Sequence, residues 1–261
     1  AERKFSLKNQ VTDVSSLLSG GADKLNIPRV DEESASSLSG GAAVSYSANT
    51  DEKVTLTVDQ HFYSAKRIDD VVKVQESADL FNMYAKSMGY ALAKKVENAI
   101  ALEIQAGSNN DVTLGTANTL LSSEIRSGTQ SLMDIGVDYT SDTYLYASPA
   151  AYNSLFAVDE FSLSNEAGRA SAHATGSQGS IMGMDAFYSV DWDDDGGSGD
   201  ESASIFTKDS ILFAMQIAPR VQSAYDIDYL ATSVVVDVLF GVEATQAAGN
   251  AAEQIVNFNN P

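Results

Sequence analysis

The chain has 261 residues, of which 44% are hydrophobic, so it can bury one large core or two modest ones. It contains no cysteine, which excludes a disulfide framework, a thiol nucleophile and a cysteine-ligated zinc site. The formal net charge is -20, and residues 97–261 carry 23 acidic but only 4 basic side chains. Because phosphate contacts need a basic face, this composition argues against a protein that wraps nucleic acid directly.

The apolar and charged patterns set further expectations. Nowhere do 18 apolar residues run together, so we expect no membrane-spanning helix and no membrane partner. The first ten residues, AERKFSLKNQ, lack the apolar core of a secretory signal. The acidic part of the chain is expected to face water, where its self-repulsion keeps particles dispersed.

The first third of the chain predicts an arm followed by an extended hairpin. Residues 1–27 are polar and serine-rich, which indicates an arm rather than part of a core. Residues 31–52 hold few large apolar side chains, whereas residues 53–59 alternate strictly. The apolar positions on one face of that strand are Val54, Leu56 and Val58. Residues 22–68 therefore predict a long two-stranded excursion that is marginal alone and is stabilised by packing on another surface, such as a neighbouring subunit.

One long amphipathic helix is predicted over SADLFNMYAKSMGYALAKKVENAIALEIQAGS. Ser77 is its candidate N-cap, and Gly107 provides the stop. The apolar residues that recur at every fourth position are Leu80, Tyr84, Met88, Leu92, Val96, Ile100 and Ile104. About 30 helical residues span roughly 45 Å. We interpret the apolar stripe as a face that packs on a core.

Beyond this helix the chain alternates between helical and extended segments. Shorter helices are expected over residues 122–135 and 149–156, the second with Pro149 in its first turn. Strands are expected over residues 143–147, 181–192, 204–207, 220–225 and 231–245. Residues 210–217 fit either a strand or a short helix.

Candidate catalytic residues are few. The two histidines, His61 and His173, have no acidic or histidine partner in a metal-binding or triad pattern. No phosphate-binding glycine loop and no GxSxG nucleophile motif occurs in the sequence. The sequence therefore predicts no catalytic residue and no cofactor site, and we do not expect an enzyme.

The acidic stretch VDWDDDGGSGDES, residues 190–202, begins like a calcium loop. The residues that match positions 1, 3, 5 and 6 of an EF-hand loop are Asp191, Asp193, Asp195 and Gly196. The twelfth position is Ser202, so the bidentate glutamate is missing, and the flanks are strand-like. We interpret the stretch as a solvated turn between two strands. Three of its five aspartates, Asp191, Asp193 and Asp195, are the metal-ligand candidates in the chain.

The order of these parts resembles the major capsid proteins of tailed bacteriophages, especially short-tailed ones, which have the Hong Kong 97-type fold. The stretch SADLFNMYAKSMGYALAKKVENAIALEIQ is similar to their long spine helix, and TYLYASPAAYNSLF to their strand-then-helix segment. GSIMGMDAFYSVDW resembles the passage before the last strands. FTKDSILFAMQIAPRVQSAYDIDYLATSVVVDVLFGVEAT resembles the ending of these proteins. The resemblance covers most of residues 22–245.

The resemblance implies an α+β fold with five parts. Residues 1–27 are then the N-terminal arm, and residues 28–70 the extended loop. Residues 71–109 and 218–246 form the peripheral domain, which contains the spine helix and the long strands. Residues 110–217 form the axial domain, and residues 247–261 a C-terminal tail.

The resemblance also implies a function. The chain is expected to self-assemble as pentamers and hexamers into an icosahedral shell that encloses a double-stranded DNA genome. Its expected partners are further copies of itself, scaffolding and portal proteins, and packaged DNA at the inner face of the shell. Its expected location is the virion, after assembly in the host cytoplasm.

Basic residues are scarce in this acidic chain, so we expect them where carboxylates crowd. The candidates for contacts between subunits are Lys66, Arg67 and Arg220. An ordinary ion pair within one subunit is an equally open interpretation.

Other readings of the sequence remain open. An encapsulin-like shell protein of a cellular nanocompartment has the same fold, and a cargo enzyme or DNA-free particles would distinguish it. A calcium-dependent secreted binding module would need metal to stay folded. A hydrolase would need a nucleophile and a base in a recognisable arrangement, which the sequence does not offer.

Overall fold

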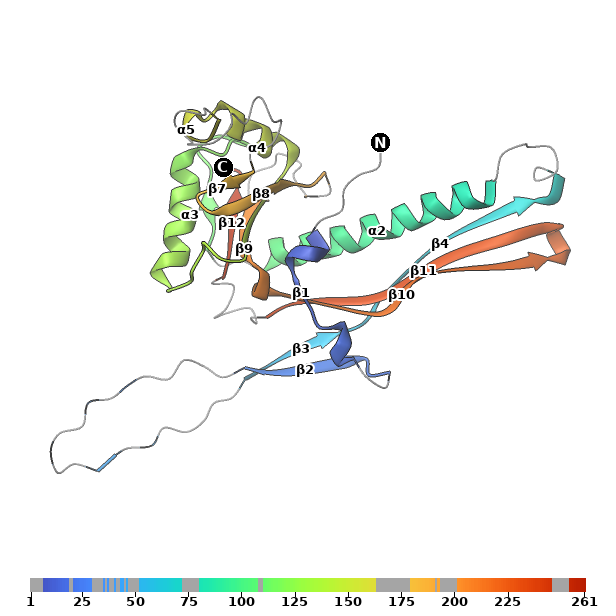
Figure 1. Cartoon of the computed structure of the whole chain (residues 1–261), viewed down its shortest axis with the longest axis horizontal. Coiled ribbons are helices and arrows are strands. Elements are labelled where there is room, and N and C mark those ends of the chain that lie inside the picture. Colours follow the sequence, from blue (N-terminus) through green and yellow to red (C-terminus); the bar gives the residue numbers. More distant parts are fainter. Residues whose placement is uncertain are drawn as a thin grey trace.

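A computed structural model describes residues 7–18, 21–29, 52–71, 80–107, 110–162, 179–190, 192, 201–245 and 254–261, with a few isolated positions between 35 and 46. Within these ranges the elements form an α+β fold with two main sheets and a separate two-stranded ribbon. Figure 1 shows an elongated molecule. A long sheet and a long helix extend from a smaller unit that is built from short strands and helices.

The long sheet has four strands, and two of them are long and antiparallel. In order across the sheet, the strands are β1 (Thr12–Asp13), β10 (Ile211–Asp226), β11 (Ala231–Ala244) and β4 (Gln60–Asp69). The 3-10 helix η5 (Ile227–Tyr229) connects β10 to β11, so the two predicted closing strands are confirmed. Residues 211–217 belong to β10 and are therefore strand. The register shifts on either side of Ile217, close to Pro219, which has no N–H to donate.

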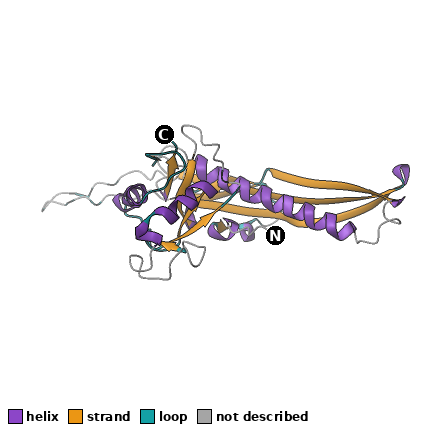
Figure 2. Cartoon of the chain, turned by 90° about the horizontal axis from the view of Figure 1, so that it is seen from above, coloured by secondary structure: helices purple, strands orange, loops and turns teal. Residues whose placement is uncertain are grey.

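The predicted long helix is α2 (Leu80–Ala106), which lies along one face of the long sheet (Figure 2). The buried members of its apolar stripe are Met88, Leu92, Val96, Ile100 and Ile104. The strand residues that are buried in the same core include Val234, Val236, Val238 and Phe240. Apolar residues at every fourth position of α2 thus pack on apolar residues at every second position of β11, as the two sequence patterns predict. The expected N-cap, Ser77, lies outside the described residues.

The smaller unit is built on a mixed sheet of six short strands. In order across the sheet, they are β5 (Val112–Thr113), β12 (Ile255–Asn259), β9 (Glu201–Thr207), β6 (Thr143–Ala147), β8 (Met184–Tyr188) and β7 (Ser180–Ile181). Its helices are α3 (Ser122–Asp134), α4 (Pro149–Ser154) and α5 (Asp159–Ser162). The hydroxyl of Ser148 accepts a hydrogen bond from the N–H of Ala151, so Ser148 caps α4 with Pro149 at its first position.

The ribbon consists of β2 (Lys24–Arg29) and β3 (Glu52–Thr57), which pair in antiparallel register. Figure 1 shows it projecting from the base of the long sheet. The three alternating residues Val54, Leu56 and Val58 are buried, as predicted. They pack with Leu212 and Ala214 of β10, so the ribbon has its own small core.

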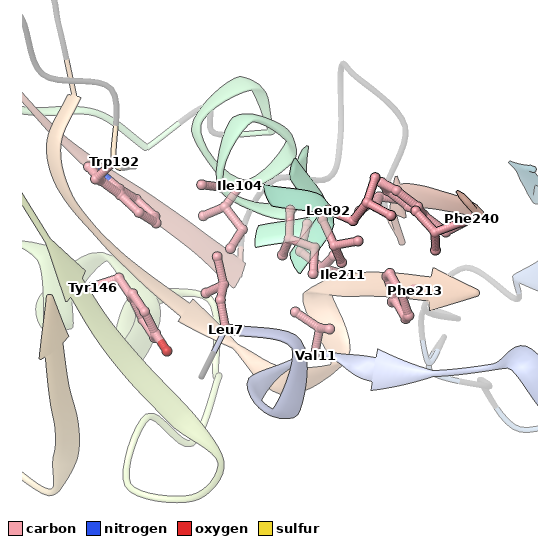
Figure 3. Packing of buried hydrophobic residues seen from close by; sticks show 14 of the residues in the cluster. Leu7, Val11, Leu92, Ile104, Tyr146, Trp192, Ile211, Phe213 and Phe240 are labelled. Carbon is pink, nitrogen blue, oxygen red and sulfur yellow. The ribbon is translucent and has the colours of Figure 1, made fainter. Parts of the chain in front are cut away.

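One continuous core joins the long sheet to the smaller unit. Figure 3 shows Ile104 of α2 and Ile211 of β10 close to Leu7, with Tyr146 and Trp192 of the smaller unit beyond them. The rings of Tyr146 and Trp192 stack at 5.9 Å between centroids. This shared core fixes the long sheet and the smaller unit relative to each other.

The described part of the N-terminal arm is not an exposed arm, which corrects one expectation. Leu7 and Val11 are 0% and 2% exposed, and both belong to the main core. The N–H of Leu7 donates to Oε1 of Glu97 at 3.2 Å, which anchors the 3-10 helix η1 (Leu7–Gln10) to α2. Val14 is buried as well, so this serine-rich segment contributes three apolar residues, Leu7, Val11 and Val14, to the interior.

The expectation of a C-terminal tail over residues 247–261 is also wrong for its last part. Residues 255–259 form β12, which lies between β5 and β9 and has four of its five side chains buried. Phe258 is fully buried against Gly128, where a Cβ would lie only 2.8 Å from the ring. The end of the chain is therefore a structural strand of the smaller unit.

Two further boundaries differ from the sequence expectation. Strand β4 pairs with β11 along its full length, so residues 60–69 belong to the long sheet and not to the hairpin. The single strand expected over residues 181–192 is also wrong. These residues contain the end of β7, a two-residue turn at Met182 and Gly183 with positive φ angles, and β8.

Candidate assembly surfaces

The ribbon covers the face of the long sheet opposite α2 at the end near the smaller unit, where Leu212, Ala214 and Leu239 pack with it. Farther along, the same face carries a charged cluster. Along β4, Phe62 and Ile68 belong to the core under α2. Because side chains alternate along a strand, His61 and Arg67 point to the other face. Both are exposed.

Asp237 lies at the centre of this cluster. Its carboxylate accepts two hydrogen bonds from Arg220, at 2.8 Å from Nε and 2.9 Å from Nη2. Nε2 of His61 lies 3.2 Å from the same carboxylate. The Arg220 bonds, with a smaller contribution from His61, lower the pKa of Asp237 from 3.8 to about 2. Three adjacent strands, β10, β11 and β4, are thus tied together by one bidentate ion pair and a histidine.

Sequence reasoning missed Asp237, although the sequence contains a signal for it. The run SVVVDVLF places one carboxylate inside a strand that is otherwise β-branched and apolar. A charge on such a strand needs a partner when it is buried, and Asp237 is 7% exposed. Cations on the neighbouring strands can supply that partner, and Arg220 and His61 lie there.

A second exposed cluster lies at the far end of the long sheet, around η5. The guanidinium of Arg67 lies 3.8 Å from the ring centroid of Tyr229 and 3.5 Å from Oδ2 of Asp226. Asp226 also accepts from the N–H of Asp228, and so starts the 3-10 turn. The large apolar side chains that are exposed at this end are Val71, Ile227, Tyr229 and Leu230. An exposed apolar group of this kind is typical of a contact with another protein.

The ribbon is seated on β11 at Gly241. A Cβ at this position would lie 2.2 Å from the carbonyl oxygen of Thr57. Only glycine lets the backbone at the end of β3 approach β11 so closely. The sequence places a glycine here without revealing that a second strand crosses it.

The structure gives two of the three predicted intersubunit cations a partner in their own chain. Arg220 pairs with Asp237, and Arg67 pairs with Asp226. Lys66 is exposed and forms no ion pair with a described residue. Both arginines therefore form ion pairs within one chain, which is the alternative that the sequence leaves open.

The acidic stretch is placed only in part. Asp191, Asp193 and Asp195 lie outside the described residues, as does His173. Residues 193–200 also lie outside the described residues, so the interpretation as a solvated turn stays a prediction. Trp192 is 3% exposed in the main core, and Ser202 is fully buried in β9, where its hydroxyl donates to Asn260.

The described residues contain no group of three or more histidine, aspartate or glutamate side chains that could hold a metal ion. An open depression of about 370 Å³ lies beside the end of β9. Its charged lining residues are Asp138, Asp142, Lys208 and Asp209. Hydrogen bonds from Thr140 lower the pKa of Asp138, so this carboxylate is already used in a local turn. No helix in the described part of the chain is long and apolar enough to cross a membrane.

Comparison with known proteins identifies the fold. No protein-family model and no curated protein matches the sequence. Solved structures match it over nearly its whole length, among them structures from phages and from a GTA particle. The fold is that of phage major capsid proteins, the Hong Kong 97-type fold, so the predicted fold class is confirmed.

Three of these structures show how far the similarity extends. A structure from Mycobacterium phage Che8 has a TM-score of 0.78 and 18% identity, with 98% of this chain and 91% of that chain covered. The capsid structure of cyanophage P-SCSP1u has a TM-score of 0.80 and 16% identity, with 100% and 89% covered. The capsid of a native GTA particle has a TM-score of 0.77 and 12% identity, with 100% and 91% covered. At these identities the similarity establishes the fold.

Proposed function

We propose that the chain is the major capsid protein of a tailed bacteriophage and forms an icosahedral shell around double-stranded DNA. The observation that carries the proposal is the match of the entire chain to about nine-tenths of the length of chains from phage and GTA capsids. The described part of the chain offers no nucleophile–base arrangement that would support catalysis. We therefore propose a structural role without enzymatic activity.

The open surfaces of the single chain support an assembled state. The part of the sheet face beyond the ribbon, the apolar end around η5 and the projecting part of the ribbon are the surfaces we propose for contacts with neighbouring copies. Stability then belongs partly to the lattice, because these surfaces are buried only when copies meet. Pentamers and hexamers of the chain are the proposed building blocks, and scaffolding and portal proteins the proposed partners during assembly in the host cytoplasm.

We propose a division into domains that follows the structure. The peripheral domain consists of α2 with the long sheet, including β4, and the axial domain is the smaller unit, including β12. The extended loop begins at β2 and ends at β3. The N-terminal arm is then the segment before Leu7, because Leu7 itself is part of the core.

Of the three proposed intersubunit cations, Lys66 keeps that role most simply. Arg67 stays a candidate through its exposed position beside Tyr229, since a cation held over a ring can still accept a second carboxylate. Arg220 is committed to Asp237 within the chain, so we propose that it stiffens the sheet and does not bind a neighbour.

Negative-stain electron microscopy of the expressed chain, or of particles from its source, tests the proposed function. Closed shells tens of nanometres across are expected, with DNA inside when they come from the source. Shells that hold an enzyme and no DNA would indicate a nanocompartment instead. A monodisperse monomer at high concentration and under assembly conditions would contradict the proposal.

A further inference from the structure

The ribbon is joined to the long sheet by a hinge of two residues, Val58 and Asp59, which lie between the end of β3 and the start of β4 (Figure 1). Strand β4 begins opposite Phe240 of β11. The next residue of β11 is Gly241, where the ribbon backbone crosses the strand. The position of the ribbon therefore depends on contacts between the hinge and the last residues of β11.

Glu243 is one of these last residues, and it lies on the face that the ribbon covers. It pairs across the sheet with Leu212 of β10, and directly opposed residues share a face. Leu212 packs in the small core that contains Val54 and Leu56 of the ribbon. Glu243 is partly buried there, and its carboxylate forms no hydrogen bond or ion pair with a described residue.

Two further carboxylates lie close to Glu243. Asp59 is part of the hinge itself, and Glu103 of α2 accepts from the N–H of Ala244. Burial raises the pKa of Glu243, and the charges of Glu103 and Asp59 raise it further. Ionised Glu243 is therefore disfavoured as long as the ribbon covers it.

The neighbouring cations do not neutralise this group. The other charged groups on the elements around this end of β11 are Asp23, Lys24 and Lys53 of the ribbon and its approach, and Lys208 and Asp209 of the 3-10 helix η4 (Lys208–Ser210). None of these lysines forms an ion pair with a described residue. Asp209 accepts from the hydroxyl of Thr12. Ionisation of Glu243 thus adds a third negative charge beside two others without a paired cation.

The contact between the ribbon and the sheet is not closely packed. An open depression of about 250 Å³ lies beside it. Its lining includes Ile27, Pro28 and Val54 of the ribbon and Leu212 of the sheet. Because a two-stranded ribbon is marginal in water, its position depends on this contact, and one added charge there is expected to shift the balance.

We infer that Glu243 and Asp59 form a pH-sensitive switch that controls whether the ribbon stays in contact with the long sheet. When Glu243 is protonated, the ribbon keeps its apolar contact with the sheet. When Glu243 is ionised, repulsion from Asp59 and the cost of a partly buried charge favour separation of the ribbon at the hinge. The inference concerns the single chain, so it stands whether or not shells form.

Proton linkage fixes the direction of the switch. In the separated state Glu243 faces water and has the ordinary carboxyl pKa of about 4.5, whereas the pKa is raised when the ribbon is in contact. The contact state therefore binds the proton more tightly. Contact is favoured at acidic pH and is lost as pH rises through the raised pKa.

The switch has a consequence for assembly that rests on the proposed function. The projecting part of the ribbon is one of the surfaces proposed for contacts with neighbouring copies. Its angle to the sheet decides where it meets them, so pH is expected to change how the chain presents this surface.

Fluorescence energy transfer in the unassembled full chain tests the inference. The chain has no cysteine, so Asn26→Cys and Gln222→Cys provide two labelling sites at exposed positions, one on the ribbon and one on the sheet. We expect the transfer efficiency to be constant at acidic pH and to shift to a new value between about pH 4.5 and pH 8.

Three substitutions in the labelled chain identify the responsible groups. Glu243→Gln should abolish the shift and keep the acidic value at every pH. Asp59→Asn should move the midpoint to lower pH, because it removes part of the repulsion that raises the pKa of Glu243. Asp134→Asn, at an exposed position at the end of α3, is the matched control and should leave the midpoint unchanged.

Three results would overturn the inference. The first is a transfer efficiency that does not change with pH, and the second is a shift that persists in Glu243→Gln. The third is a shift that runs parallel to the fluorescence of Trp192, the only tryptophan, since this side chain is buried in the main core and reports its unfolding. Shell formation remains a separate test of the proposed function.

Discussion

Gly241 is the residue whose replacement the structure forbids most clearly. An added Cβ would meet backbone atoms of Thr57 and Val58, the nearest at 2.2 Å, and backbone cannot rotate away as a side chain can. We expect Gly241→Ala to lower the free energy of unfolding by about 3 kcal/mol or more, the upper range for overpacking. Thermal denaturation of the unassembled chain measures this change.

Gly89, on α2, is the matched control. A Cβ there has no neighbour within 4 Å. Gly89→Ala should therefore raise stability by up to about 1 kcal/mol, through helix propensity alone. If Gly241→Ala were as well tolerated as Gly89→Ala, the crossing of β3 over β11 would be wrong.

Asp237 makes the stability of the chain sensitive to acid. Its pKa is lowered to about 2 in the folded chain, so its contribution is complete above the unfolded pKa near 3.8 and disappears as pH falls toward 2. The stability difference between the unsubstituted chain and Asp237→Asn should be constant at neutral pH and shrink between about pH 4 and 2. Urea denaturation across this pH range measures it.

Glu243 should behave in the opposite way. Burial, together with the nearby carboxylates of Glu103 and Asp59, raises its pKa. Its ionised form is therefore disfavoured in the folded chain, and the associated stability is present only at acidic pH and lost as pH rises. Glu243→Gln should be more stable than the unsubstituted chain at pH 7, with the gain vanishing below about pH 4. A loss of stability at pH 7 would refute this assignment.

Among the elements, β12 is the one whose role the structure changes most. It fills the gap between β5 and β9. Ser204 donates a hydrogen bond to Asn257 in the strand, and Ser202 donates one to Asn260 directly after it. Deleting residues 254–261 would leave the edge of β9 bare and a hole beside Gly128. We expect that truncated chain to be insoluble, as judged by the soluble fraction after expression.

The substitution Phe258→Ala tests the same element without removing the strand. It should cost about 3 to 5 kcal/mol, as for other fully buried aromatic side chains. Removal of Pro261 alone, which is exposed, should have little effect. A fully stable truncated chain would mean that β12 is not part of the folding unit.

The elements that can be predicted are those with a strong and long periodic pattern. Three patterns of this kind are the apolar stripe of α2, the alternation of β3 and the β-branched run of β11. Each defines one buried face over many residues, so the local sequence determines the type of element. By contrast, IVNFN of β12 is five residues long and follows a polar segment rich in alanine. Nothing local distinguishes it from a tail, because its partners, β5 and β9, are distant in sequence.

The candidate surfaces are less predictable than the fold. Because basic residues are scarce in this chain, the sequence singles out Lys66, Arg67 and Arg220 as candidates for ion pairs. It does not identify the carboxylates that they pair with. Arg220 and Asp237 are cross-strand neighbours only because the register of β10 shifts at Ile217, and register is not readable from composition. The burial of Trp192 and Ser202, near the ends of the acidic stretch, is unpredictable for a related reason, since parts of the chain that are distant in sequence bury them.

At the scale of the whole molecule, shape and charge together account for the proposed role. An elongated chain with open surfaces at its end, its ribbon and its sheet face has more surface than it can bury alone. The acidic majority of the chain favours dispersed particles. Both features fit the proposed assembly of many copies into a shell.

A cryo-electron-microscopy reconstruction of the assembled particles tests the central claim most directly. The account predicts a closed icosahedral shell in which copies of this chain occupy fivefold and sixfold capsomers. The β2–β3 ribbon should lie against a neighbouring subunit. A discrete monomer or dimer, or a shell whose density does not fit this chain, would contradict it.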